Sequence, residues 1–425
     1  MAGDEQAPRR PFLDRIVVLD DDPTGVQTLA GIRVLLVWNG AAIVAALAGR
    51  PSVHLITNSR ALRPEAAGVL VAEAARLALE SVPEAHLVLR GDSTLRGHVR
   101  EEYEAVRTAA DPDSWPVLLL VPALPSAGRV TRDGVHLIER DGVSTPLDRT
   151  EYAHDGVFSY STARLLEWAE ERSAGLFAAA EGRELHLDEL RSRGPSTVTA
   201  ALADLASRQV PAVLAPDAAT EDDLALVAEG YAEAVRSGVQ VLVRCAPAFA
   251  GVLAGTMAPG LVDAPASGER GVLVVCGSYV PTTTRQLEAL ADAWPGTLVE
   301  VDADVLATPD AQVEVERAAA AASAALRRRG VTVVATPRTR SARTSSLEAG
   351  EQVAAGLARV AGLVEPRPQV VVAKGGITSA VTLRMGFGVD AADVVGPVLP
   401  AARSTTSSSP GTSAPTTSSS ACSPA

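Results

Sequence analysis

Three polar motifs in this sequence each follow an apolar run that is typical of a β-strand. They are DDDPTG (residues 20–25), TNSR (57–60) and RGDSTLRGH (90–98). The carboxylates of Asp21, Asp22 and Asp92 can accept hydrogen bonds from hydroxyls or bind a metal ion. The guanidinium groups of Arg60, Arg90 and Arg96 are planar forks suited to a carboxylate or a phosphate. A pocket that carries both charges suits a polyhydroxy acid.

The alternation of strands and helices predicts where these motifs lie. Apolar runs at 17–19, 53–56 and 86–89 read as strands, and residues 64 to about 79 have helical periodicity, with Pro64 at a favourable first position. Ligands of open α/β sheets bind at the carboxyl ends of the strands. We therefore expect one shared pocket at a sheet edge, although each motif alone also fits a helix cap or a solvated turn.

The remainder of the first half continues this pattern around an insertion. A strand at 116–121 ends in a loop at 122–131 that Pro and Gly keep irregular. Residues 132–160 have weak periodicity, and we expect them to fold over the pocket. Alternation then returns through strands at 213–217 and 241–244.

A second half begins after residues 258–270, a stretch rich in Pro, Gly and Ala that we interpret as a linker. A strand at 271–276 ends at Gly277-Ser278, and further strands are expected at 297–301 and 331–335. The strand at 369–373 runs into KGGITS (374–379) before a helix expected to begin at Ala380. A Gly-Gly pair there exposes backbone N–H groups to an anion, although a tight turn is an equally ordinary interpretation.

The composition excludes several classes of function. The 425 residues carry a net charge of −13 and no basic stripe, so a nucleic-acid partner is not expected. The three cysteines lie far apart, which argues against a disulfide framework or a zinc site. No apolar segment reaches the roughly 20 residues that span a bilayer, and the N-terminus resembles no signal peptide. We expect a cytoplasmic protein without a membrane partner, and a homo-oligomer is compatible with the chain.

These patterns predict an α/β protein of two domains, each a mainly parallel sheet flanked by helices. The expected divisions are 1–257 for the first domain, 258–270 for the linker and 271–400 for the second domain. Residues 401–425 are rich in Ser and Thr, and we expect them to be disordered. The abrupt change after Pro400 suggests that the native ending has been replaced.

The motifs resemble the four-carbon acid sugar kinase family, whose members use ATP to phosphorylate threonate, erythronate and their oxo forms. The resemblance covers residues 15–400, and the order and spacing of the motifs are more specific than any motif alone. It rests on the three polar motifs, with DDDPTG extended to DDDPTGVQT (20–28), on the loop at 122–131, on CGSYVPTTTRQLEAL (276–290) and on AKGGITSAVTLRMG (373–386).

The resemblance implies that residues 1–257 are the substrate domain and 271–400 the nucleotide domain, with the active site in the cleft between them. It also implies a role for each matching residue. Substrate-binding positions are Asp21, Asp22, Thr24, Gly25, Ser59, Arg60, Asp92, Ser93 and Arg96. Nucleotide-binding positions are Ser278, Gly375, Gly376, Ile377 and Thr378, with ATP and Mg²⁺ as the implied cofactors. The family's last nucleotide-contacting element, a Gly-Asn-Val-Gly-like turn, has no counterpart after Pro400, so we expect an incomplete nucleotide domain.

Phosphoryl transfer requires an in-line hydroxyl and neutralised charge rather than covalent catalysis. We predict that Asp22 or Asp21 accepts the proton of the substrate hydroxyl. The other of the two, or Asp92, would hold Mg²⁺ or a second hydroxyl, while Arg60 and Arg96 clamp the carboxylate of the sugar acid.

Three alternatives are weighed against this kinase. A sugar-acid-binding protein without turnover follows if the missing turn prevents nucleotide binding. A dinucleotide-dependent oxidoreductase is disfavoured because no GxGxxG motif is present. A metal-dependent hydrolase is disfavoured because the six histidines lack ligand spacing.

Overall fold

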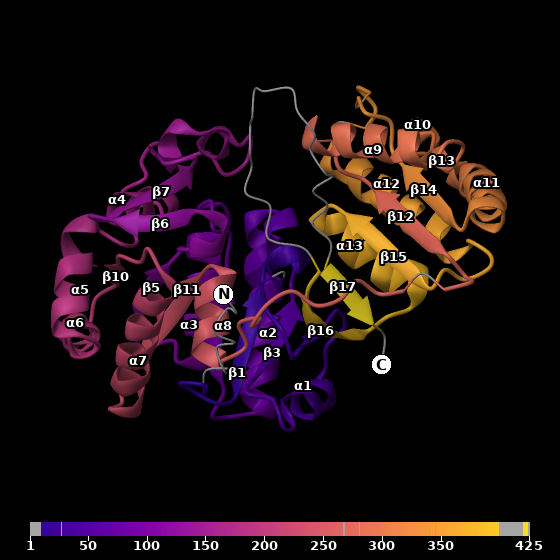
Figure 1. Cartoon of the computed structure of the whole chain (residues 1–425). Helices are drawn as coiled ribbons and strands as arrows, with labels where there is room; N and C mark the ends of the chain where they lie inside the picture. The colour runs from indigo at the N-terminus through magenta and orange to yellow at the C-terminus, as the bar shows by residue number, and fades with distance from the viewer. Residues whose placement is uncertain are drawn as a thin grey trace, which may run out of the picture. The chain divides into compact units, whose positions relative to one another are not determined.

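The computed structural model describes residues 10–26, 28–266, 268–279, 281–339, 341–344, 346–398 and 420–423. The chain divides into two compact units (Figure 1). The first contains Met1–Gly260 and Asp393–Gly396, and the second contains Leu261–Ala392. Each unit is built on a mainly parallel sheet with flanking helices, so the predicted α/β class with two sheets is confirmed.

The first unit is organised around a mainly parallel sheet in the order β16-β2-β3-β1-β4-β11-β5-β10-β9. The strand pairs from β2 to β9 are all parallel. The strands are β1 Ile16–Asp20, β2 Ile32–Leu35, β3 Ser52–Ile56, β4 His86–Arg90, β5 Val117–Val121, β9 Arg183–Leu185, β10 Val213–Pro216, β11 Val241–Cys245 and β16 Ala391–Pro397. A further strand, β17 Ser420–Ser423, belongs to the second unit.

Helices of the first unit bury this sheet, and the residues of its central strands are accordingly mostly apolar. Leu119 of β5 and Val243 of β11 belong to one buried cluster with Leu202, Tyr231 and Phe249 of the helices. The helices are α1 Gly40–Leu47, α2 Pro64–Ser81, α3 Val99–Ala110, α4 Leu165–Arg172, α5 Leu187–Arg193, α6 Ser196–Ser207, α7 Glu221–Arg236 and α8 Pro247–Ala254.

The order of the strands brings the three polar motifs together. Strand β1 lies between β3 and β4, and Asp20 at its end is in register with Ile56 on one side and Arg90 on the other. The motifs that follow these strands therefore start at the same edge of the sheet. The predicted convergence is confirmed, and short 3-10 turns, η1 Pro23–Val26 and η2 Ser59–Ala61, follow β1 and β3.

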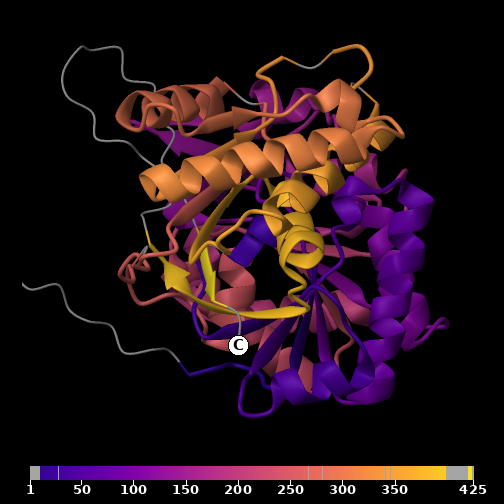
Figure 2. The same ribbon diagram turned by 90° about the vertical axis from the view of Figure 1, so that its right-hand side faces the viewer.

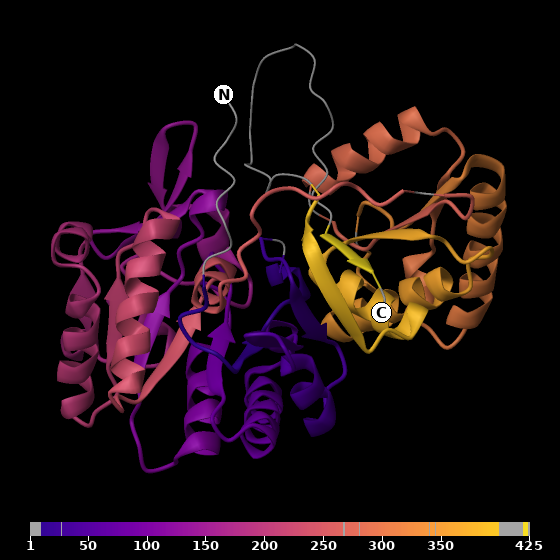
Figure 3. The same ribbon diagram turned by 60° about the horizontal axis from the view of Figure 1, so that its bottom comes forward.

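The insertion, whose periodicity in the sequence is weak, contains a three-stranded antiparallel sheet, β6-β7-β8. Two Asp-Gly dipeptides, at 133–134 and 141–142, make its turns with positive φ at all four residues, which is the favoured chemistry of two-residue hairpins. Figure 3 shows this ribbon as a purple hairpin at one side of the first unit. Its elements are η3 Pro125–Ala127, β6 Arg129–Arg132, β7 Val135–Arg140, β8 Val143–Pro146, η4 Leu147–Arg149 and η5 Glu151–His154; η6 Ala179–Glu181 follows later.

The second unit contains a four-stranded parallel sheet in the order β13-β14-β12-β15. Figure 2 views this unit from the side of its helices. A side-chain hydrogen bond from Arg359 to Gln312 joins α12 to α11. Its elements are β12 Val272–Cys276, α9 Pro281–Ala293, β13 Leu298–Glu300, α10 Ala303–Leu306, α11 Ala311–Arg329, β14 Val331–Ala335, α12 Leu347–Gly362, β15 Val370–Lys374, α13 Gly376–Val381 and the π-helical turn η7 Thr382–Gly386.

Strand β16 returns from the second half of the chain to the sheet of the first unit. Arg33 and Arg50 each lie 3.3 Å from the carboxylate of Asp393, and the backbone N–H of Gly31 donates to Val394 at 2.8 Å. The predicted second domain, 271–400, includes residues 393–396, whereas the structure places Asp393–Gly396 in the first unit. Of the segment 401–425 the structure describes only β17, so its expected disorder stays a prediction. No helix in the described ranges is both long and apolar enough to cross a membrane.

Candidate active site

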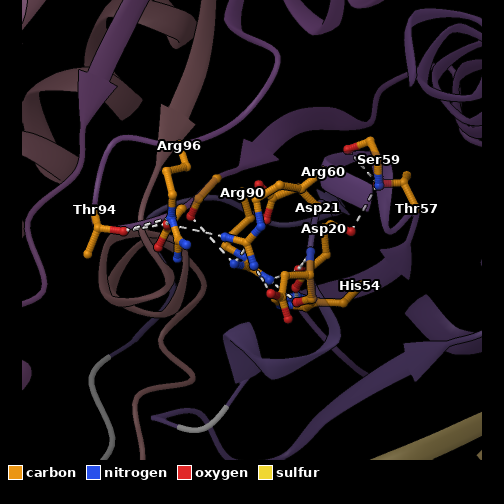
Figure 4. A network of polar contacts seen from close by, with 12 residues as sticks. Asp20, Asp21, His54, Thr57, Ser59, Arg60, Arg90, Thr94 and Arg96 are labelled. Carbon is orange, nitrogen blue, oxygen red and sulfur yellow. Dashed lines mark hydrogen bonds and ion pairs between the residues drawn. The ribbon is translucent and has the colours of Figure 1, made fainter. Parts of the chain in front are cut away.

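The first carboxylate of the DDDPTG motif, that of Asp20, stabilises the strand ends. Asp20 is fully buried, and its Oδ2 atom lies 3.1 Å from Nδ1 of His54 on β3. Its Oδ1 atom accepts a hydrogen bond from Arg90 on β4. The hydroxyl of Thr57 donates to the backbone oxygen of Asp20 at 2.9 Å. Figure 4 shows that Asp20 thus connects all three strands. The guanidinium of Arg90 forms a buried ion pair with Asp20.

The second carboxylate, that of Asp21, has a different environment. Its side chain is 2% exposed, and neither carboxylate oxygen accepts a hydrogen bond from the described residues. The nearest cation is Arg90, whose NH1 atom lies 3.2 Å from Oδ1. Burial raises the pKa of Asp21 to about 6, although Arg60 and Arg90 act to lower it.

Asp22 and Asp92 are held by arginines. The guanidinium of Arg60 contacts the carboxylate of Asp22, and its NH1 atom lies 3.3 Å from Oδ2 of Asp92. The same Oδ2 atom accepts a hydrogen bond from Nε of Arg96 at 2.6 Å. Burial alone would raise the pKa of Asp92, but Arg60 and Arg96 outweigh it and hold the pKa well below its usual range.

The insertion packs on the third motif, as expected of a segment that folds over this edge of the sheet. Asp155 lies 3.5 Å from NH1 of Arg96, and the hydroxyl of Tyr160 donates to the backbone oxygen of Thr94 at 3.1 Å. His136 is fully buried, with Nε2 at 2.9 Å from the backbone oxygen of Ser93. Burial lowers the pKa of His136 to about 4, so Nε2 is the N–H donor of a neutral imidazole.

Ser59 and Gly25 both contact other residues of the protein in ways that support the fold. The fully buried hydroxyl of Ser59 donates to Oε1 of Glu102 at 2.6 Å, so its direct contact with a substrate stays a prediction. A Cβ atom on Gly25 would lie 2.0 Å from Cζ of Arg90, and Gly25 is therefore needed where the backbone approaches Arg90. The side chain of Thr24 lies outside the described residues.

Two buried charged residues of the same region belong to none of the motifs, and the sequence analysis did not predict a role for them. Arg244, near the end of β11, and Glu102, on α3, are 3% and 2% exposed, and their side chains form an ion pair. The arginine within the apolar run VLVRC (241–245) could have indicated a buried ion pair, because a charge on a buried strand needs a partner.

The predicted nucleotide-binding residues lie together in the second unit. Strands β12 and β15 are neighbours, with Cys276 in register with Lys374, so the turns that follow them start at one edge. A Cβ atom on Gly375 would lie 3.3 Å from Oγ1 of Thr378 and 3.7 Å from Cβ of Ser278. The positive φ of Gly375, 108°, suits its place between strand and helix.

The helix after this turn begins earlier than expected. The predicted start at Ala380 is wrong, because α13 begins at Gly376 and Gly375 is its N-cap. Residues 376–378 therefore form the first helical turn, where backbone N–H groups have no partner within the helix. The side chain of Ile377 lies outside the described residues.

The acids of the first unit are poorly suited to Mg²⁺. The charges of Arg60, Arg90 and Arg244 all act on Asp21, and guanidinium groups repel a divalent cation. Within the described ranges, ligating side chains gather within 4.8 Å only at Asp133, His186 and Asp217. There, Asp217 already accepts hydrogen bonds from the backbone N–H groups of Asp133 and Gly134. The residues present do not favour a metal site at Asp21 or Asp92.

Comparisons with known proteins match both units. A family model described as a sugar-binding N-terminal domain matches residues 16–253, and one described as a nucleotide-binding C-terminal domain matches residues 273–416. D-erythronate kinase of Heliobacterium modesticaldum is 31% identical over 312 residues, which are 70% of this chain and 65% of that protein. D-threonate kinase of Salmonella typhimurium is 26% identical over 329 residues, 76% of this chain and 72% of that protein.

Solved structures show the same fold. A protein from Haemophilus influenzae aligns with a TM-score of 0.59 and 16% identity, over 90% of this chain and 91% of that chain. A protein from Salmonella typhimurium aligns with a TM-score of 0.63 and 17% identity, over 89% of each chain. The sugar-binding model alone spans more than half of the sequence, and this chain belongs to the four-carbon acid sugar kinase family.

Proposed function

We propose that this protein is a kinase that transfers the γ-phosphoryl group of ATP to a hydroxyl of a four-carbon sugar acid of the erythronate or threonate type. The observation that carries the proposal is the carboxylate of Asp21. It is buried and accepts no hydrogen bond from the described residues, and it lies within the part of the chain matched as sugar-binding. Its ion pair with Arg90, at 3.2 Å, leaves both oxygens without a hydrogen bond. A buried carboxylate in that state is costly, so a ligand hydroxyl is a natural hydrogen-bond partner.

Asp21 is the general base in this proposal. A pKa of about 6 leaves the carboxylate ionised at neutral pH and makes it a better proton acceptor than an ordinary aspartate. Asp22 is less suited, because its ion pair with Arg60 stabilises its charge. The sequence leaves both acids open as the base, and their surroundings favour Asp21.

Arg60 and Arg96 bind the carboxylate of the sugar acid. Both side chains are partly exposed, at 17% and 29%. Each guanidinium has five N–H donors. The contacts with Asp22, Asp92 and Asp155 fix the orientation of the two forks, which lowers the entropy cost of clamping a substrate.

The second unit binds the nucleotide. Residues 376–378 place their backbone N–H groups at a helix start, with Ser278 and Thr378 beside them, and such groups bind phosphate oxygens. ATP supplies the phosphoryl group, and Mg²⁺ bound to its phosphates neutralises their charge. No side chain of the first unit is assigned to the metal.

A coupled assay of ADP release over D-erythronate, D-threonate and their enantiomers tests this function. Turnover with at least one four-carbon acid, and none with the matching sugars that lack the carboxylate, is expected. Calorimetry with each ligand separates the alternative of a binding protein, which would bind the acid and give no heat with ATP. Absence of both acid binding and turnover contradicts the proposal.

A further inference from the structure

Arg244 is a buried arginine, and only part of its guanidinium group is hydrogen-bonded to the described residues. Its NH1 atom pairs with Oε2 of Glu102, and Glu102 is itself held by the hydroxyl of Ser59 at 2.6 Å. The NH2 atom of Arg244 makes no hydrogen bond to the described residues, although the residue is only 3% exposed. A buried donor of a charged group is rarely left without a partner.

The NH2 atom of Arg244 and the Oδ2 atom of Asp21, which both lack a hydrogen bond to the described residues, lie near the same glycine, Gly97. A Cβ atom placed on Gly97 would lie 2.5 Å from NH2 of Arg244 and 3.5 Å from Oδ2 of Asp21. Gly97 is buried, and its φ of 128° is one that side chains with a Cβ rarely adopt. A cationic donor and an anionic acceptor therefore both lie beside Gly97, and no side chain of that residue stands between them.

The opposite charges of Asp21 and Arg244 determine which kind of ligand group can bind to both. A hydroxyl accepts and donates hydrogen bonds through a single oxygen, so it can satisfy both groups at once. A carboxylate would be repelled by Asp21, and an ammonium group would be repelled by Arg244. Neither ion fits the pair as well as an alcohol does.

We propose that Arg244 is a substrate-binding residue whose NH2 group donates a hydrogen bond to the sugar-acid hydroxyl that becomes phosphorylated. This proposal rests on the proposed kinase function. Asp21 takes the hydroxyl proton, the oxygen forms a bond to the γ-phosphorus, and the bond between that phosphorus and ADP breaks, with ADP leaving. Glu102 holds Arg244 and is a positioning residue. Because a guanidinium stays protonated, Arg244 stabilises the negative charge that develops on the oxygen.

The test compares wild-type protein with Arg244→Lys by calorimetry. The ligands are D-erythronate, D-threonate and three acids that each lack one hydroxyl: 3,4-, 2,4- and 2,3-dihydroxybutanoate. Arg191→Lys is the matched control, because Arg191 pairs with Asp223 elsewhere in the first unit, at 2.8 Å. Thermal unfolding checks that each variant folds.

We expect Arg244→Lys to bind the preferred trihydroxy acid about tenfold or more weakly, since a charged hydrogen bond is lost. It should bind one of the three dihydroxy acids as the wild type does, and that acid should not be phosphorylated. ATP affinity should be unchanged, and Arg191→Lys should behave as wild type. The double variant Arg244→Gln/Glu102→Gln removes both buried charges and should show the same selectivity, which covers a failure of the single variant to fold.

Two results would overturn the inference while leaving the kinase function intact. One is unchanged binding of the trihydroxy acid by Arg244→Lys. The other is an equal loss for all three dihydroxy acids, which would mean that Arg244 acts through the fold. If the wild type binds no sugar acid, the proposed function fails as well.

Discussion

The carboxylates of Asp20 and Asp21 are consecutive in the chain and both buried, yet only that of Asp20 is hydrogen-bonded within the described residues. Asp20 accepts a hydrogen bond from Arg90 and lies within hydrogen-bonding distance of His54, whereas both oxygens of Asp21 are without hydrogen bonds. The guanidinium of Arg90 contacts both carboxylates, but it makes a hydrogen bond only to that of Asp20 and lies 3.2 Å from Oδ1 of Asp21 without one. One carboxylate therefore joins the strands, and its neighbour remains available to a ligand.

Replacing Asp21 should separate activity from stability. Asp21→Asn removes the proton acceptor, and we expect kcat to fall by about 10²- to 10⁴-fold, the usual contribution of a general base. The same variant should be more stable at pH 7, by up to about 3 kcal/mol, because it removes a charge that burial disfavours. Steady-state kinetics and thermal unfolding of the same preparation measure both effects.

Asp22→Asn is the control for this prediction. Asp22 is ion-paired with Arg60, so its replacement should mainly raise KM for the sugar acid and leave kcat within about tenfold of wild type. A large loss of kcat in Asp22→Asn with near-normal kcat in Asp21→Asn would reverse the assignment of the base.

The pH dependence of activity should follow the ionisation of Asp21. With a pKa of about 6, the carboxylate gains its charge as the pH rises from 5 to 7, and kcat/KM for the sugar acid should rise over the same range. Rates measured from pH 5 to 8 at constant ionic strength give the apparent pKa. A flat profile would contradict a base with this pKa.

The contribution of Asp21 to stability should fall as the pH rises from about 4 to 6, whereas activity should rise with pH. Between its ordinary value of 3.8 and about 6, Asp21 keeps its proton in the folded chain and loses it in the unfolded chain. The folded state then binds more protons, so the contribution of this group to stability falls as the pH rises. The difference in Tm between wild type and Asp21→Asn should grow from pH 4 to 6 and then level off.

The sequence predicts the meeting of the polar motifs because that meeting depends on strand order and alternation alone. Apolar runs followed by polar residues are sufficient to place residues 20–25, 57–60 and 90–98 at one sheet edge. The identity of the free carboxylate is not predictable in this way. It depends on which of three adjacent aspartates meets Arg90 and which meets Arg60, and side-chain directions decide this only in the folded chain.

Other features require contacts between residues that are distant in the sequence. The ion pair of Glu102 and Arg244 joins residues 142 positions apart, and neither belongs to a motif. The start of α13 was placed four residues late because Gly-Gly favours a turn, whereas Gly375 alone supplies the positive φ and Gly376 is helical. The hairpins of the insertion were predictable from Asp133-Gly134 and Asp141-Gly142, but weak periodicity concealed them.

Gly25→Ala should test the close approach between the first motif and Arg90. The added Cβ would lie 2.0 Å from Cζ of a guanidinium that is itself buried, so Arg90 must move away from Asp20. We expect a loss of about 1–3 kcal/mol in stability, typical of overpacking. Gly260→Ala, where a Cβ atom meets nothing within 4 Å, should unfold at the wild-type temperature. Equal Tm values for the two variants would contradict the tight packing.

Gly277→Ala should impair the nucleotide site while leaving the sugar-acid site unchanged. A Cβ atom on Gly277 would lie 2.4 Å from Oγ1 of Thr378 and 3.3 Å from Leu357. Thr378 is β-branched and buried, so it has little freedom to turn away, and the first turn of α13 must shift. We expect ATP affinity to fall tenfold or more, since phosphate binding by backbone N–H groups depends on their placement.

The matched control for this variant is Gly350→Ala in α12 of the same unit, where a Cβ atom meets nothing within 4 Å. An alanine there should stabilise the helix by about 0.5–1 kcal/mol and leave ATP binding unchanged. Calorimetry with ATP, and separately with the preferred sugar acid, measures both sites in each variant. Unchanged ATP affinity in Gly277→Ala would remove the turn at 375–378 from the nucleotide site, because that substitution cannot be accommodated without moving Thr378.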